Sequence, residues 1–111
     1  MKNSLKSNRD FQEVYHHGKS LANKYFVMYV CPREDENKKL GISVSKKVGN
    51  SVVRHHLTRL LREVFRLNEK MFNSGLNIVV IVRVNAKDIS YKEAEQAFME
   101  LASRHKILEE Q

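Results

Sequence analysis

The sequence predicts an α+β fold, an α/β sandwich formed as a single domain over residues 1–111. Helix-capping signals recur along the chain, three segments have the apolar patterns of strands, and one strand–helix–strand unit is long enough for a parallel crossover. An apolar content of 41% in 111 residues suffices for one modest core. The expected order is helix, strand, strand, an optional further strand, helix, strand and helix, around a small central sheet.

The chain is expected to begin with a short helix and a strand. Ser7 is placed to cap a helix that ends near His17, before Gly18, and Asp10 is placed to complete a capping box with Ser7. The run 25–31 is rich in aromatic and β-branched residues, which predicts a strand.

The next strand, residues 39–46, has the alternating pattern of a half-exposed strand. Its apolar face carries Leu40, Ile42 and Val44, and its other face carries Gly41, Ser43 and Ser45. Because this second face is small and polar, we expect it to be open to a ligand.

A long helix is expected from a cap at Asn50 or Ser51 to about Phe72. Its predicted buried stripe repeats at steps of four and three: Val53, Leu57, Leu60, Val64 and Leu67. A second stripe lies about 200° around the axis and consists of His55, Arg59, Arg62 and Arg66. These basic side chains are therefore expected to point away from the core.

A central strand and a closing helix are expected to complete the chain. The near-continuous apolar run 76–84 is typical of a strand buried on both faces. Ser90 and Glu93 form a second capping box, which opens a helix to about Ile107. The strand–helix–strand unit over residues 40–84 suggests that its two strands are parallel.

The formal net charge of +7 arises in one segment. Residues 37–62 contain seven Lys or Arg and no acid, whereas the rest of the chain contains 13 of each sign. Lys46 and Lys47 lead through Gly49 into the long helix, whose N-terminal N–H groups also favour an anion. A positive field confined to one segment indicates a polyanionic partner, and we expect a nucleic acid.

Aromatic residues gather in the first helix and the first strand. Phe11 and Tyr15 share one helix face, while Tyr25 and Tyr29 are expected on one strand face with Phe26 on the other. Such side chains can stack unpaired bases beside a basic edge, as in single-stranded RNA recognition. Spacing alone leaves open whether they form a stacking platform or an ordinary core.

Together these segments resemble the bacterial ribonuclease P protein component. The similarity is carried by SNRDFQEVYHHGKSLAN (7–23) and LGISVSKKVGNSVVRHHLTRLLRE (40–63), and it extends over nearly the whole chain. It implies the family's sandwich with a left-handed strand–helix–strand crossover, against the usual right-handed rule. It also implies a subunit of a ribonucleoprotein whose RNA, with Mg²⁺ held mainly by that RNA, cuts precursor tRNA to give the mature 5′ end.

The resemblance also implies which residues contact RNA. The RNA-binding set would be Lys46, Lys47, Asn50, Arg54, His55, His56, Arg59, Arg62 and Arg66. A cleft for the 5′ leader, between the first helix and the open sheet face, would be lined by Phe11, Tyr15, His17, Tyr29 and Ser43. No protein side chain would be catalytic, and no residue is assigned to a metal, although the sequence leaves open whether the protein binds a metal ion of its own. The partners would be the catalytic RNA and precursor tRNA in the cytoplasm, with no membrane and no required protein partner.

Three positions of the basic helix depart from the family's pattern. Two usual cations are replaced by His56 and Thr58, and a usual Asn is replaced by His55. In the first helix, Tyr15 stands where Phe is usual. Because histidine changes charge near neutral pH, we expect RNA affinity to be unusually pH-dependent between about pH 6 and 8.

Three other classes of protein can also have a small basic domain. An independent enzyme is disfavoured, because Cys31 has no nucleophile signature and neither a carboxylate pair nor a Gly-rich nucleotide loop is present. A membrane-surface protein is disfavoured by the lack of a basic, broadly apolar helix with Trp anchors. A general RNA-binding or ribosome-associated protein without a processing role is the alternative that physical arguments leave open.

Overall fold

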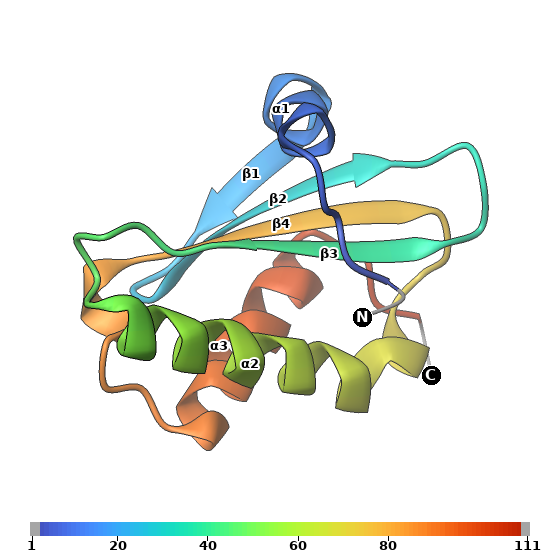
Figure 1. Cartoon of the computed structure of the whole chain (residues 1–111). Coiled ribbons are helices and arrows are strands. Elements are labelled where there is room, and N and C mark those ends of the chain that lie inside the picture. The colour runs from blue at the N-terminus through green and yellow to red at the C-terminus, as the bar shows by residue number, and fades with distance from the viewer. Residues whose placement is uncertain (1–2, 110–111) are drawn as a thin grey trace.

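The computed structural model describes residues 3–109 as three layers, with helix α1 on one side of a sheet and helices α2 and α3 on the other (Figure 1). The elements are α1 (Asn8–His17), β1 (Lys19–Ala22), β2 (Phe26–Pro32), β3 (Lys38–Ser43), α2 (Ser51–Asn68), η1 (Glu69–Met71), β4 (Leu76–Val82), η2 (Val84–Ala86) and α3 (Tyr91–Arg104). The predicted α+β class is confirmed.

The sheet has the strand order β1-β2-β4-β3. β2 pairs antiparallel with β1 and β4, whereas β3 pairs parallel with β4, so that Leu40 lies beside Ile78. The parallel pair and the interior position of β4 are as predicted from the sequence. α2 forms the connection between the two parallel strands, and it covers the sheet together with α3 (Figure 1).

Strand β1 is the fourth strand, whose residues the sequence patterns did not locate. It is four residues long, lies at one edge of the sheet and pairs with β2, with Leu21 opposite Met28. The predicted strand boundaries also change: β2 begins at Phe26 rather than at Tyr25, and β3 ends at Ser43 rather than at Lys46.

The main core lies between the sheet and the two helices α2 and α3. Phe72 packs against Phe65 and Phe98, with ring centroids 5.3 and 5.8 Å apart. On α2 the buried residues are Leu57, Leu61, Val64 and Phe65. The expectation that Leu67 is buried is wrong, because that side chain is 57% exposed. The buried residues of α2 are centred about 65° around the axis from the predicted stripe, which leaves Leu67 about 100° from the centre of the buried face.

Side-chain caps set the helix starts. Asn50, rather than Ser51, caps α2, because its Oδ1 accepts from the Val53 N–H at 3.0 Å. In α3, Ser90 and Glu93 form the predicted capping box, with both bonds at 3.1 Å. In α1, Ser7 accepts from the Asp10 N–H at 3.2 Å, but the return bond that we expected from Asp10 is not formed.

A smaller core lies under α1 on the opposite face of the sheet. Leu5, Val14 and Val79 are buried there, and partly buried aromatic residues pack around them. The ring of Phe11 lies directly over Gly41, so that a Cβ on Gly41 would be 2.6 Å from the Phe11 Cζ. The face of β3 that we expected to be open is therefore covered at Gly41.

Candidate nucleic-acid interface

The aromatic residues predicted for the cleft meet where α1 crosses the sheet. The rings of Tyr15 and Tyr29 are 5.0 Å apart in an edge-to-face arrangement, and Phe11 lies 6.4 Å from Tyr15. Burial raises the pKa of the Tyr15 hydroxyl, while a hydrogen bond with Ser43 acts in the opposite direction. Tyr15 is thus a neutral phenol at physiological pH, and it lies beside the last residue of β3.

The sheet next to these tyrosines provides an apolar floor that the sequence analysis missed. Val27 pairs with Ile81, and Ile81 pairs with Ser43 on the neighbouring strand. All three are half-buried, and they form the row of paired residues next to the row that contains Tyr29. The alternation within β2 and β4 would have indicated Val27 and Ile81 once the strand order was known.

Two of the predicted residues lie apart from these aromatic rings. His17 is exposed, and it borders a separate hollow with Glu13, Cys31 and Arg33. The expectation that Tyr25 shares a strand face with Tyr29 is wrong. Tyr25 precedes β2 and packs on the side of α3, where its hydroxyl donates to Glu93 at 3.4 Å.

The predicted basic stripe lies on the outer face of α2. His55, Arg59, Arg62 and Arg66 are exposed, as is His56. Arg66 is paired with Glu63, from Nε to Oε2 at 3.0 Å, and this carboxylate raises the pKa of Arg66. Within residues 3–109, neither Arg59 nor Arg62 has a carboxylate within 4.0 Å.

The first turns of α2 and the preceding loop continue this basic surface. Lys46, Lys47 and Asn50 are exposed, whereas Arg54 is half-buried. The Arg54 Nε is buried and has no hydrogen-bond partner within the part of the chain described. Thr58 donates to the Arg54 carbonyl at 2.9 Å, so its hydroxyl is directed along the helix.

The predicted site residues therefore form two surfaces on opposite sides of the sheet. The first surface, which we call the aromatic cleft after its predicted role, consists of Phe11, Tyr15, Tyr29, Val27, Ile81 and Ser43 and lies on the side of α1. The basic surface consists of the outer face of α2 and Lys46 and Lys47. The loop of residues 44–50 connects the two surfaces, because it leaves β3 at Ser43 and enters α2 (Figure 1).

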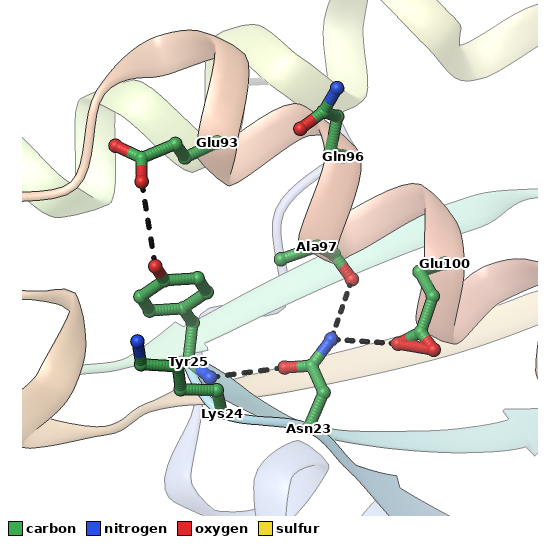
Figure 2. A pocket seen from close by; sticks show the side chains of 7 residues that line it. All are labelled: Asn23, Lys24, Tyr25, Glu93, Gln96, Ala97 and Glu100. Carbon is green, nitrogen blue, oxygen red and sulfur yellow. Dashed lines mark hydrogen bonds between the residues drawn. The ribbon is translucent and has the colours of Figure 1, made fainter.

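A further hollow, between the β1–β2 turn and α3, is lined by residues that are joined to one another by hydrogen bonds (Figure 2). The Asn23 Oδ1 accepts from the N–H groups of Tyr25 and Phe26 at 3.1 and 3.0 Å. Its Nδ2 donates to the Ala97 carbonyl at 3.0 Å and to Glu100 at 2.9 Å. Asn23 therefore fastens the turn to α3, and the two acids of this hollow make it a poor site for phosphate.

Residues 3–109 contain no group of three or more His, Cys, Asp or Glu side chains placed to hold a metal ion. Nor does any helix in this range have the length and apolar character needed to cross a membrane.

A small α+β domain with a basic helix and an aromatic cleft defines a class of RNA-binding protein. A family model described as Ribonuclease P matches residues 1–106, and the chain belongs to the ribonuclease P protein family. It is 56% identical to the ribonuclease P protein component of Lachnoclostridium phytofermentans, over 97% of this chain and 93% of that one. It is 42% identical to that of Clostridioides difficile, over 93% and 91%.

Solved structures show the same relationship. The chain is similar to the RNase P protein of Staphylococcus aureus at a TM-score of 0.89 and 36% identity, over 96% of this chain and 98% of that one. It is similar to the RNase P protein from Thermotoga maritima at a TM-score of 0.84 and 32% identity, over 91% and 96%. The resemblance read from the sequence is confirmed: the chain is an RNA-binding ribonuclease P subunit and acts in tRNA processing.

Proposed function

We propose that this subunit binds the catalytic RNA through the basic surface and the 5′ leader of precursor tRNA through the aromatic cleft. The RNA subunit would carry the chemistry, the hydrolytic cut that releases the mature 5′ end. The observation that carries this proposal is the pair of surfaces on opposite sides of one sheet, which gives two RNA segments separate places to bind.

The basic surface suits a folded RNA with closely spaced phosphates. Arg59 and Arg62 are exposed and have no acidic partner in the described part of the chain, so their guanidinium groups are available for bidentate contacts with phosphates. Lys46 and Lys47 would add contacts beside the N-terminus of α2. Arg66 would contribute less, because Glu63 already neutralises it.

The aromatic cleft suits an unpaired strand such as a leader. Tyr15 and Tyr29 present ring faces and edges beside the apolar floor of Val27 and Ile81, which supports stacking without sequence preference. Ser43 would offer a hydroxyl at the end nearest the basic loop. His17 borders a different hollow, so we assign it no contact with the leader.

Mg²⁺ belongs to this proposal as an ion held mainly by the RNA, and it would support the hydrolysis there. The protein's cations would supply part of the charge neutralisation that the two RNAs need when they assemble. We further propose that the assembly works in the cytoplasm and requires no second protein.

Cleavage assays at low Mg²⁺ test the proposal. A ribonuclease P catalytic RNA would be incubated with precursor tRNAs that carry a long or a very short 5′ leader, with and without the protein. We expect the protein to restore cleavage and to raise affinity more for the long leader. Binding of both RNAs with no effect on rate or on leader dependence would contradict the proposal and favour a general RNA-binding role.

Single substitutions assign the two surfaces. Tyr29→Ala should weaken binding of the long-leader substrate about tenfold, because one stacked base contributes about 1–3 kcal/mol. Tyr25→Ala is the matched control, since Tyr25 lies on the side of α3. Arg59→Gln with Arg62→Gln should weaken binding of the catalytic RNA and reduce its salt dependence. Equal effects of Tyr29→Ala and Tyr25→Ala on the leader would contradict the proposed cleft.

A further inference from the structure

A cationic hollow lies at the edge of the sheet, outside both surfaces described above. It is lined by Lys19, Ser20 and Leu21 of β1 and by Arg104, His105 and Lys106 at the end of α3. No acid lines this hollow. Its six residues come from two segments that are far apart in the sequence. We call these residues the cationic corner, and we propose that it binds phosphates of the 5′ leader beyond the aromatic cleft.

The hydrogen bonds of the corner leave two of its cations available. Arg104 donates to the Ala22 carbonyl at 3.1 Å and pairs with Glu100 at 3.6 Å, so it fastens α3 to β1. His105 donates from Nε2 to the Met28 carbonyl at 2.9 Å. Within residues 3–109, neither Lys19 nor Lys106 has a carboxylate within 4.0 Å, and both are exposed.

The backbone at Lys106 provides an independent argument. The Lys106 N–H donates to the Ser103 carbonyl and the Ile107 N–H to the Ala102 carbonyl, at 3.0 and 3.2 Å, which is the Schellman pattern of helix termination. Lys106 has a φ of 60°, in the left-handed region where glycine is the usual residue. A lysine therefore occupies a position where glycine would be less strained, and it places a charge there.

The position of the corner selects the leader among RNA segments. Ser20 lines the corner and pairs across β1 and β2 with Tyr29 of the aromatic cleft. A strand that leaves Tyr29 along Ser20 and turns around the edge strand β1 thus arrives at Lys19 and Lys106, which lie on the side of α3. The basic surface lies on α2, which does not line the corner. The loop that joins the basic surface to the aromatic cleft follows β3, the edge strand opposite β1.

This inference rests on the proposed function, and it adds a third contact to the path of the leader. Lys19→Gln combined with Lys106→Gly removes both available cations, and the second change relieves the strained backbone. The matched control is Lys87→Gln with Lys92→Gln, which removes the same charge from exposed positions before and at the other end of α3. Lys106→Gly alone should have an unchanged or higher Tm, which separates a binding defect from a folding defect.

The test measures binding of precursor tRNAs with long and very short leaders to the complete holoenzyme, and of the catalytic RNA to the free protein. We expect the corner variant to bind the long-leader substrate about three- to tenfold more weakly, as for the loss of two exposed ion pairs. Its log–log salt slope should fall by about 1.4, since each phosphate contact on a single strand contributes about 0.7. The short leader and the catalytic RNA should be unaffected.

Three results would overturn the inference. One is unchanged binding of the long leader, and another is an equal loss in the control variant, which would indicate a general effect of net charge. The third is a loss confined to the catalytic RNA, which would assign the corner to that RNA. If the unmodified holoenzyme itself shows no preference for long leaders, the proposed function fails first and the inference falls with it.

Discussion

Replacement of Gly41 by alanine should destabilise the protein, although the same change at an open strand position usually stabilises. Alanine lowers the entropy of the unfolded chain, which favours the folded state by about 0.4–1 kcal/mol where the native conformation accepts it. At Gly41 the new Cβ would lie 2.6 Å from the Phe11 Cζ, 3.0 Å from the Phe11 Cε2 and 3.2 Å from the Leu5 Cβ. The sign of the effect therefore reports whether the Phe11 ring covers β3.

The magnitude follows from how the contact can relax. The Phe11 ring lies at the end of a side chain and can move, whereas the Leu5 Cβ is attached directly to the backbone. Overpacking of this kind costs about 1–3 kcal/mol. We expect a net loss of about 1–2 kcal/mol in the free energy of unfolding, which corresponds to a fall of about 4–10 °C in Tm.

The assay is chemical denaturation of four proteins: the unmodified chain, Gly41→Ala, Phe11→Ala and the double variant. Without the ring, alanine at position 41 should be neutral or stabilising, so the double variant should be more stable than the sum of the single effects predicts. A neutral or stabilising Gly41→Ala in the unmodified chain would refute the reasoning. Additive effects, within about 0.3–0.5 kcal/mol, would also refute it.

Three further predictions concern other parts of the molecule. Asn23→Ala should lower stability by about 2 kcal/mol in thermal or chemical unfolding, because it removes the bonds that join the β1–β2 turn to α3; equal stability would show that the turn needs no clamp. Arg33 holds the pKa of Asp35 well below its usual range, so this carboxylate stabilises the fold above about pH 4 and loses its effect as pH falls through the lowered pKa. Asp35→Asn should thus destabilise at pH 7, with a difference from the unmodified chain that narrows in acid; a difference independent of pH would contradict the pairing. His55→Gln with His56→Gln should flatten the dependence of catalytic-RNA affinity on pH between about 6 and 8, and affinity in the unmodified protein that does not change over this range would exclude a role for the pair.

The elements with strong local signals could be predicted from the sequence. The cap at Ser90, a cap at Asn50 or Ser51, the interior position of β4 and the exposed basic stripe of α2 all follow from patterns within one segment. Strand β1 did not, because four residues with three exposed side chains carry no alternation that distinguishes a strand from a loop. Its pairing with β2, a tertiary contact, makes it a strand.

The site was predicted in part, for the same reason. Tyr15 and Tyr29 were identified, but spacing could not show that their rings meet, since they belong to different layers. Tyr25 was placed on the wrong side, because the alternation was extended one residue before the strand begins. Counting charges over consecutive residues could not predict the cationic corner, because Lys19 and Lys106 come from nearly opposite ends of the chain.

The interior position of β4 has a consequence for synthesis of the chain. Both β2 and β3 pair with β4, yet β4 ends only at Val82, after α2 has been made. Until then the nascent chain has two strands that lack their shared neighbour and an apolar face without cover, which are the features that favour aggregation. Strand pairs that are so distant in sequence form late and slowly. Most of this chain must therefore emerge from the ribosome before a stable sheet can form.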